Sequence, residues 1–499
     1  GRADAQTSPA DNLGALPYDT YLLEELPCAA NEGHRLVSTL VTISRDGVNL
    51  DLGTLDDETL PEPEPPAVAT TLLSDTTAGH DAPSYADSTV TDTVSLTNLS
   101  IGESYEVRGT LRTVERGEGG EKVVGQVLDT GQTSFVADET SMEVQISFDL
   151  DADALAGKTV NAAEELLCEG EVVASHDDLS DEGQSVHLPS VTTSAHDGET
   201  GSRASAETGA RTLVDTVRLE NLLVGETYVL RSSAHARNVA EDGSTSDGGV
   251  LPAPGGGEAT AEHEFVANAQ NMEVTVEIDY DASALEGRDV VAFEELRRSG
   301  VLLAVHTDVD DAEQTLRVPS VETQATADAT GTQELPAEEG QVVTDLVHVA
   351  NLVEGETYEL TATLHLKGRD EDGRVVDLGE LTDAAGEPLT ATTTFVAQAG
   401  EADVELSLPV DAEALAGEEV VFFERLSSRD VTLALHADIN DADQTLSVPA
   451  LDEPTAPEEP AAPTGGVPAT GEAAGIAASV ALAGLAVACA GGLLAARRR

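Results

Sequence analysis

The sequence predicts an all-β protein built from tandem β-sandwich domains, and two observations lead to that prediction. Apolar and polar residues alternate strictly in three segments, 142–150, 272–280 and 402–410, which is typical of strands with one buried face. A set of polar residues also recurs at a step of 130 residues, the usual size of one domain. Several short strands in each such unit favour a sandwich.

The recurring polar set contains a His and a Gln eight residues apart, with a Glu twelve residues before the His. Surface loops tolerate insertions, so such spacing rarely persists there by chance. Each unit therefore requires a carboxylate, an imidazole and a carboxamide in fixed relation. The three sets are Glu164, His176 and Gln184; Glu294, His306 and Gln314; and Glu424, His436 and Gln444.

Three further features recur in the same order in every unit. A Thr-x4-Asp pattern opens the unit, an Asp follows within an apolar strand, and an N-L-x-x-G-E-x-Y turn comes next. The opening pairs are Thr70 and Asp75, Thr192 and Asp197, and Thr323 and Asp328. The strand aspartates are Asp92, Asp215 and Asp345, and the turns begin at Asn98, Asn221 and Asn351.

Composition shifts divide the chain into seven segments. Residues 1–60 resemble the end of a β domain, with strands expected at 21–23 and 35–37, and the Pro-rich residues 61–66 form a stiff linker. Three repeats follow at 67–190, 191–320 and 321–450. Residues 451–466 are a linker rich in Pro, Glu and Ala, and 467–499 form a distinct C-terminal segment. The chain starts at Gly1 without Met or signal peptide, so we expect a fragment or a processed product.

The charge of the chain excludes some partners. Its 94 acidic and 25 basic residues give a net charge of −69, which argues against nucleic-acid binding because phosphate contacts need cations. The 40% apolar content is sufficient for domain cores, although aromatic residues make up only 3%. The three cysteines lie in different segments and predict neither a disulfide framework nor a zinc site. We expect no metal or cofactor.

The recurring groups suit one reaction, the attack of a Thr hydroxyl on a Gln carboxamide to give an ester and ammonia. A base must take the hydroxyl proton, and a His oriented by an Asp is a common solution. A carboxyl in an apolar setting has a raised pKa and can protonate the leaving nitrogen or polarise the carbonyl. Fixed geometry supplies effective molarities of ~10⁵ M or more.

In the order and spacing of these residues, the repeats resemble the T-Q ester bond domains, or VaFE repeats, of Gram-positive surface adhesins. The naming motif is present as Val291-Ala292-Phe293-Glu294 and as Val421-Phe422-Phe423-Glu424. The resemblance covers about 67–450 and implies Ig-like sandwiches, each locked by a self-formed Thr–Gln ester. It implies the ester pairs Thr70–Gln184, Thr192–Gln314 and Thr323–Gln444. It also implies assisting groups Asp92, Glu164 and His176; Asp215, Glu294 and His306; and Asp345, Glu424 and His436.

Repeat 1 departs most from the family pattern. Ala163 replaces the Phe before the Glu, and Asn161 lies on the same strand. We expect a smaller, wetter pocket that raises the Glu164 pKa less. Thr71 and Thr193 directly follow two of the candidate threonines and remain alternatives, although Thr323-Gln324 favours the first position.

The C-terminal segment resembles a sortase sorting signal. Val467-Pro468-Ala469-Thr470-Gly471 precedes an apolar stretch at 473–496, and three arginines end the chain. The stretch is long enough to cross a bilayer as a transmembrane helix. Val467 stands where the LPXTG-like motif has Leu. The resemblance implies cleavage between Thr470 and Gly471 and attachment to peptidoglycan after transient membrane retention; a plain membrane anchor is the alternative.

Other crosslinks and ligands are less favoured. The chain has three lysines, Lys122, Lys158 and Lys367, and none of them lies in repeat 2. A Lys–Asn isopeptide bond therefore cannot be the crosslink common to all three repeats. Residues 16–33 look like the closing strands of a SpaA-type or prealbumin-like domain. The acidic run 308–311 could suggest calcium but lacks the EF-hand loop pattern, and we interpret it as a solvated loop.

We therefore expect a cell-wall-anchored adhesin stalk that displays a ligand-binding N-terminal region, with sortase, peptidoglycan and a host or neighbouring-cell ligand as partners. It is not a turnover enzyme on this interpretation. Three alternatives remain: repeats that themselves bind a host glycan or protein, a hydrolase using Asp, His and Glu, and a pilus subunit. The scarcity of aromatic residues disfavours the first, and three near-identical sites disfavour the second.

Overall fold

The computed structural model describes residues 18–45, 50–56, 58–59, 64–285 and 287–451. The predicted linker at 452–466 and the predicted sorting signal and transmembrane helix at 467–499 lie outside the described residues. No helix in the described part of the chain is long and apolar enough to cross a membrane.

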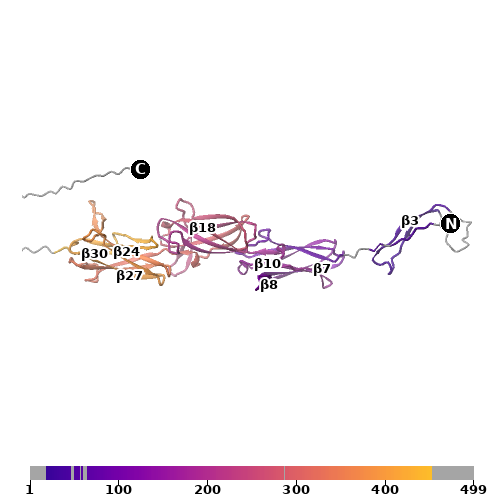
Figure 1. The fold of residues 1–499 in the computed structure, drawn as a ribbon, viewed down its shortest axis with the longest axis horizontal. Coiled ribbons are helices and arrows are strands. Elements are labelled where there is room, and N and C mark those ends of the chain that lie inside the picture. Colours follow the sequence, from indigo (N-terminus) through magenta and orange to yellow (C-terminus); the bar gives the residue numbers. More distant parts are fainter. Residues whose placement is uncertain (1–17, 46–49, 57, 60–63, 286, 452–499) are drawn as a thin grey trace, which may run out of the picture. The chain divides into compact units, whose positions relative to one another are not determined.

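Three β-sandwiches follow one another along the chain and confirm the predicted all-β, Ig-like fold (Figure 1). In each, a three-stranded sheet faces a larger sheet of five or six strands. The small sheets have the orders β5-β6-β9, β13-β14-β18 and β22-β23-β27, and every pairing in them is antiparallel.

Repeat 1 contains eight strands and two short helical turns. These elements are β5 (Ala67–Ser74), β6 (Ser88–Thr97), β7 (Ser104–Arg116), β8 (Lys122–Val136), β9 (Met142–Leu150), α1 (Ala152–Leu155), β10 (Thr159–Cys168), β11 (Glu171–His176), η1 (Glu182–Gln184) and β12 (Ser185–His187). The larger sheet has the order β11-β10-β7-β8, with β12 also paired to β10.

Repeats 2 and 3 keep this topology, with two strands in place of β8. Repeat 2 comprises β13 (Ser190–Asp197), β14 (Ala210–Glu220), β15 (Thr227–Val239), β16 (Thr245–Val250), β17 (Thr260–Val266), β18 (Met272–Asp281), η2 (Ala282–Ala284), β19 (Asp289–Arg298), β20 (Val301–His306), η3 (Ala312–Gln314) and β21 (Thr315–Leu316). Repeat 3 comprises β22 (Ser320–Ala327), β23 (Gln341–Ala350), β24 (Thr357–Arg369), β25 (Val375–Glu380), β26 (Thr390–Val396), β27 (Glu401–Val410), β28 (Glu419–Ser428), β29 (Val431–His436) and β30 (Thr445–Ser447).

The alternating segments form the predicted half-buried strands. In β9, Ile146, Phe148 and Leu150 are buried while the residues between them are exposed. The same alternation holds in β18 and β27. Each repeat has its own apolar core between its sheets, so the three units are separate domains in the physical sense.

Four strands form two small sheets in the N-terminal segment: β1 (Asp19–Glu24) pairs with β3 (Ser38–Ile43), and β2 (His34–Arg35) pairs with β4 (Glu58–Thr59). The expected strand at 21–23 lies within β1. Of the strand expected at 35–37, only Arg35 lies in a strand, because β2 ends there and β3, in a different sheet, begins at Ser38. The prealbumin-like assignment of this segment stays a prediction.

Candidate functional site

A threonine on the first strand of each repeat donates its hydroxyl hydrogen bond to the aspartate of the second strand. The aspartates are 0% exposed, and the threonine precedes the aspartate by 22 residues each time. The pairs are Thr70 with Asp92, Thr193 with Asp215, and Thr323 with Asp345.

The threonine of repeat 2 is therefore Thr193, and the prediction of Thr192 is wrong. Thr193 lies opposite Val217 in the ladder, as Thr70 lies opposite Val94 and Thr323 opposite Val347. Thr192 is exposed, because consecutive strand residues point to opposite faces. Thr71, the other alternative, is likewise exposed, whereas Thr70 keeps its predicted place.

The opening Thr-x4-Asp pattern misled because its aspartates are not equivalent. Asp197 is the last residue of β13, whereas Asp75 and Asp328 come directly after their strands. A different pattern marks the threonine correctly: Pro-Ser-Val-x-Thr occurs at 189–193 and 319–323. With Thr193, the connector from Gln to the next Thr is nine residues at both junctions, 184 to 193 and 314 to 323.

A glutamate in the larger sheet binds the glutamine that closes each repeat. The Gln184 amide nitrogen donates to Glu164 Oε2 at 2.7 Å, and Gln314 donates to Glu294 at 2.9 Å. Gln444 and Glu424 make the same bond. All six side chains are at most 1% exposed. The glutamine Oε1 atom has no hydrogen-bond partner in any repeat.

The segment that carries the glutamine lies against the first strand of its repeat. Gln184 ends the turn η1, which lies against β5, and Gln314 ends η3, which lies against β13. In repeat 3 the amide of Ala325, two residues after Thr323, donates to the carbonyl of Asp443, the residue before Gln444, at 2.9 Å. The Thr therefore lies on the small sheet, and the Gln lies in the turn that leads into the last strand of the larger sheet.

The Asp and Glu of each site interact, and burial keeps the Glu protonated. Burial, followed by the repulsion of Asp92, raises the pKa of Glu164 to about 10. The same causes raise the pKa of Glu424 to about 10, with Asp345 as the neighbour, and raise that of Glu294 well above its ordinary value. Two carboxyls this close cannot both ionise readily. The site thus holds a neutral carboxylic acid near neutral pH.

Burial also raises the pKa of Asp92 and Asp345, while the hydrogen bond from the threonine hydroxyl opposes the shift. A carboxylate with a raised pKa is a stronger base than an exposed one. Asp92 and Asp345 are therefore chemically suited to accept the proton of the threonine that each binds.

These pKa shifts predict how an uncrosslinked repeat depends on pH. In a Gln444→Ala chain, the free energy of unfolding of repeat 3 should fall as pH rises from 4.5 to about 10, the ordinary and folded pKa values of Glu424. Over that interval folded Glu424 retains a proton that the unfolded chain has lost, so the folded state is progressively penalised. Urea unfolding at stepped pH measures this slope.

The matched control for this prediction is Gln444→Ala combined with Glu424→Gln, which keeps a neutral side chain and should flatten the pH dependence. A stability of Gln444→Ala that is constant or rises across this interval would contradict the assignment of Glu424 as a neutral acid.

Each predicted histidine lies directly opposite its glutamate in the ladder: Glu164 faces His176, Glu294 faces His306, and Glu424 faces His436. His436 Nδ1 is 3.9 Å from Glu424 Oε2. In repeat 2, His306 Nδ1 is 3.1 Å from the carbonyl of Val191, two residues before Thr193. The imidazole therefore borders both the acid and the first strand.

An aspartate that the sequence analysis missed orients this histidine. The histidine Nε2 lies 3.3 Å from Asp181, 2.9 Å from Asp311 and 3.0 Å from Asp441 in the three repeats. Each of these aspartates also accepts a hydrogen bond from the backbone amide two residues later. The second-strand Asp instead accepts the threonine hydroxyl hydrogen bond.

The signal for this residue was present as His-x4-Asp-x2-Gln in all three repeats. Asp311 belongs to the acidic run that we interpreted as a solvated loop, and that interpretation is wrong for this residue. The described residues contain no group of three or more His, Cys, Asp or Glu side chains that could hold a metal ion.

The Ala163 substitution of repeat 1 does not affect the carboxyl pocket. Position 163 precedes Glu164 on its strand and so points to the opposite face of the sheet. The Glu164 pKa is raised to about 10, as for Glu424. The expectation that the Glu164 pKa is raised less is therefore wrong, whereas the wetter pocket stays a prediction.

On that outer face, repeats 2 and 3 stack an aromatic pair, Phe293 on His235 and Phe423 on His365, with ring centroids 4.2 and 4.1 Å apart. Repeat 1 replaces the pair by a polar contact. The Arg112 guanidinium donates to Asn161 Oδ1 at 3.1 Å and pairs with Asp177. The VaFE motif thus combines an inward Glu with an outward Phe.

The fold and the site together define a protein of tandem Ig-like domains, each with a Thr beside a buried Asp, Glu and Gln and with a bordering His. A family model described as "T-Q ester bond containing domain" matches residues 66–188, 189–318 and 319–448. The chain belongs to this family.

Two solved structures illustrate the wider similarity. One is a bacterial adhesin from Mobiluncus mulieris containing intramolecular disulfide, isopeptide and ester bond crosslinks; it is 17% identical, with 48% of this chain and 80% of that chain covered, at a TM-score of 0.24. The other is a solved chain reported for a 1.5-MDa bacterial ice-binding adhesin; it is 14% identical, with 77% of this chain and 96% of that solved chain covered, at a TM-score of 0.19. No curated protein matches the chain.

Proposed function

We propose that each repeat forms an ester between its Thr Oγ1 and its Gln Cδ, giving the pairs Thr70–Gln184, Thr193–Gln314 and Thr323–Gln444. The observation that carries this proposal is a series of interactions repeated three times: the Thr donates to the Asp, the buried Asp interacts with the buried Glu, and the Glu accepts from the buried Gln. A structural polar network would not require a base, a neutral acid and an amide in that order.

In the proposed reaction the Asp takes the hydroxyl proton as the Thr oxygen bonds to the Gln Cδ. Negative charge then develops on the Gln carbonyl oxygen. The two ends of a carboxamide are similar in size, so turning the amide brings this oxygen against the protonated Glu, which can donate a hydrogen bond to it.

The reaction is completed when the Cδ–N bond breaks. The leaving NH₂ group takes one proton and departs as ammonia, and the proton originates from the threonine hydroxyl by way of Asp and Glu. The products are one ester and one ammonia, with no net change in the protonation of the site. The His, which is held by Asp181, Asp311 or Asp441 in its repeat, borders the route of the proton and can assist the proton transfer. Each site acts once, because its product is the protein itself.

The crosslink would give each repeat a covalent load path. Tension entering at the Thr would leave at the Gln, and only the nine-residue connectors would extend, at ~3.3–3.6 Å per residue. This suits a stalk exposed to shear and proteases. We therefore propose a surface adhesin stalk, anchored to the cell wall by sortase at Thr470 and displaying a ligand-binding N-terminal region.

Intact mass measurement tests the proposal. The chain should weigh less than the mass calculated from its sequence by three ammonia molecules, one for each ester. The Gln314→Ala chain should weigh less than its own calculated mass by only two. Material released from the walls of a sortase-bearing Gram-positive host should end at Thr470. An unmodified mass would overturn the ester proposal, and an intact C-terminus would overturn the anchoring proposal.

A further inference from the structure

The N-L-x-x-G-E-x-Y turn has a geometry that the ester does not require. Its Asn adopts a left-handed backbone with φ near 60° in all three repeats, a conformation that Asn tolerates better than most residues. The Tyr hydroxyl accepts the backbone amide two residues after the Asn, at 2.9–3.0 Å. The turn is therefore rigid, and it fixes the direction of the Asn side chain.

That side chain holds the connector between repeats. Asn221 Nδ2 donates to the carbonyl of Leu188 at 3.3 Å, and Asn351 Nδ2 donates to that of Val318 at 2.9 Å. Leu188 and Val318 each precede the proline that leads into the next repeat. Asn98 makes the equivalent bond to the carbonyl of Pro65 at 3.1 Å.

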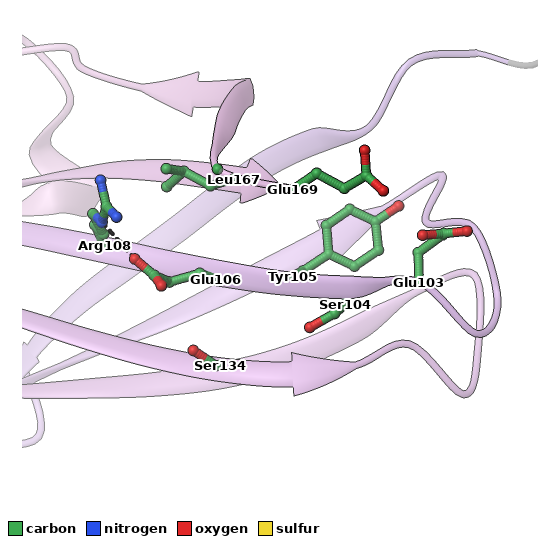
Figure 2. A pocket seen from close by; sticks show the side chains of 9 residues that line it. Glu103, Ser104, Tyr105, Glu106, Arg108, Ser134, Leu167 and Glu169 are labelled. Carbon is green, nitrogen blue, oxygen red and sulfur yellow. Dashed lines mark hydrogen bonds and ion pairs between the residues drawn. The ribbon is translucent and has the colours of Figure 1, made fainter.

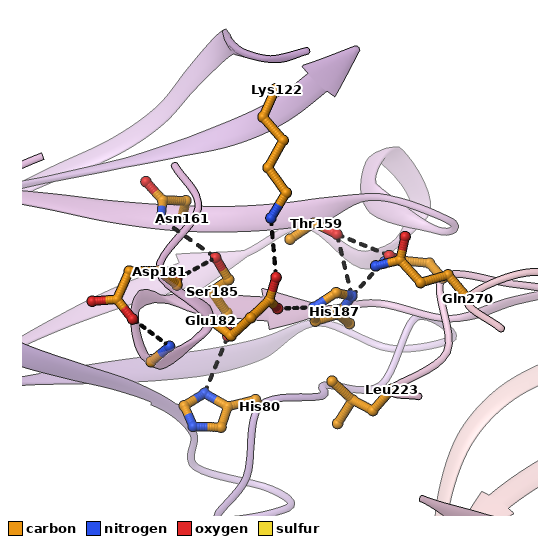
Figure 3. A network of polar contacts seen from close by, with 12 residues as sticks. His80, Lys122, Thr159, Asn161, Asp181, Glu182, Ser185, His187, Leu223 and Gln270 are labelled. Atoms are coloured by element: carbon orange, nitrogen blue, oxygen red, sulfur yellow. Dashed lines mark hydrogen bonds and ion pairs between the residues drawn. The ribbon is translucent and has the colours of Figure 1, made fainter. Parts of the chain in front are cut away.

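Further polar contacts link the turn to the preceding repeat. At the first junction, Asn221 Oδ1 is 2.8 Å from Thr159 Oγ1 and 2.9 Å from His187 Nδ1. Figure 3 shows Thr159 and His187 of this network, where His187 also contacts Glu182 and Glu182 pairs with Lys122. At the second junction the corresponding partners are Asp289, which accepts from Asn351 at 2.5 Å, and Arg317, which donates to Asn351 at 3.2 Å.

A second contact joins the same repeats at a different place. The loop after the first strand of one repeat meets the hairpin after the Glu strand of the next. The Ser84 amide donates to the Leu303 carbonyl at 2.7 Å, and the Glu207 amide donates to the Leu433 carbonyl at 3.0 Å. Leu303 is 0% exposed and Leu433 is 1% exposed.

An arginine on the hairpin reinforces each of these contacts. Arg298 binds Asp81 through two hydrogen bonds of 2.5 and 2.6 Å, and Asp81 is 0% exposed. Arg429 donates to the Thr200 carbonyl at 2.6 Å. Bidentate Arg–carboxylate pairs are among the strongest polar contacts, and burial makes the loss of one partner costly.

We propose that the N-L-x-x-G-E-x-Y turn and the loop-to-hairpin contact form a two-point joint that holds consecutive repeats in one orientation. One attachment alone would leave a rotation about the connector free, whereas two separated attachments remove it. The joint is non-covalent and acts between repeats, so it is independent of the ester inside each repeat.

The hairpin of repeat 1 provides a natural reference, because no repeat of this kind precedes it in the described chain. The equivalent of Leu303, Val173, is 36% exposed. The hollow beside this hairpin is lined by Glu103, Glu106 and Glu169 (Figure 2). The hairpin turn, 168–171, reads Cys-Glu-Gly-Glu and lacks the arginine of the other two. The acidic hairpin of repeat 1 therefore lacks the arginine that would pair with a loop carrying a residue such as Asp81.

Hydrogen exchange at Ser84 and Glu207 tests the joint, because each amide is bonded across one junction. Asn221→Gly keeps the left-handed turn and removes the side chain. In the full chain it should speed exchange at Ser84 by about tenfold, on the order of one net hydrogen bond, and leave Glu207 unchanged. Asn351→Gly should do the reverse. Asn98→Gly, in the same turn of repeat 1, should change neither.

Arg298→Gln gives an independent test from the other attachment and should also speed exchange at Ser84 alone. Intact mass measured on the same samples reports the esters, so a fold defect or a failed ester is distinguished from an open joint. The proposal is overturned if exchange at Ser84 in the unaltered chain matches that of exposed turns, or if neither Asn221→Gly nor Arg298→Gln changes it.

Discussion

Replacing Thr193 by valine is expected to leave repeat 2 without its crosslink, whereas replacing the neighbouring Thr192 is expected to leave the crosslink intact. Valine has nearly the shape of threonine but no hydroxyl, and only Thr193 donates to Asp215. The Thr193→Val chain should therefore retain one ammonia that the parent chain loses. Intact mass, followed by peptide mapping of the Thr193 and Gln314 segments, measures the difference.

The stability of repeat 2 should change by a large amount in the same variant. The ester would close a loop of 121 residues, from 193 to 314, and a covalent closure of about 100 residues constrains the unfolded chain by roughly 4.7 kcal/mol. For a domain of this size that corresponds to a fall in Tm on the order of 15 °C. Calorimetry should show one transition moving while the others remain.

Thr192→Val is the matched control, since the side chain is exposed on the other face of β13. It should keep the parent mass deficit and the parent transition. If Thr192→Val instead lost the mass deficit of one ammonia, and Thr193→Val kept it, the ester would have to be assigned to Thr192. That result would contradict the register of this strand.

The fold could be predicted because its signals depend on period and spacing. The strands with one buried face alternate as expected, and the Asp, Glu, His and Gln are brought together as predicted because Glu and His face each other across one ladder in every repeat. A regular ladder converts a constant sequence separation into a constant spatial relation.

The errors arose where spacing alone does not fix which face a residue lies on. Thr192 and Thr193 are equally polar, and only the ladder shows which points inward. Phe293 adjoins Glu294 in sequence, yet it packs on the outer face against His235. Asp311 did not stand out in a chain with 94 acidic residues, although its position three residues before Gln314 recurs in every repeat.

Asp345→Asn is expected to slow ester formation in repeat 3 by about 10²–10⁴-fold, the range for losing a positioned general base. An asparagine oxygen can still accept the Thr323 hydrogen bond, so the geometry is retained, but the amide cannot take the proton. After folding, the Asp345→Asn chain should therefore take far longer than the parent chain to lose the ammonia of repeat 3. Intact mass sampled over time after folding gives the rate.

The control is Asp441→Asn, which weakens the hold on His436 Nε2 but leaves the contact between Thr323 and Asp345 untouched. If the Asp is the base and the His only assists, Asp441→Asn should slow the reaction far less than Asp345→Asn. The opposite ranking would make His436 the base that sequence reasoning first suggested. Because both changes replace a carboxylate by its amide, the difference between the two rates distinguishes Asp345 from His436 as the base.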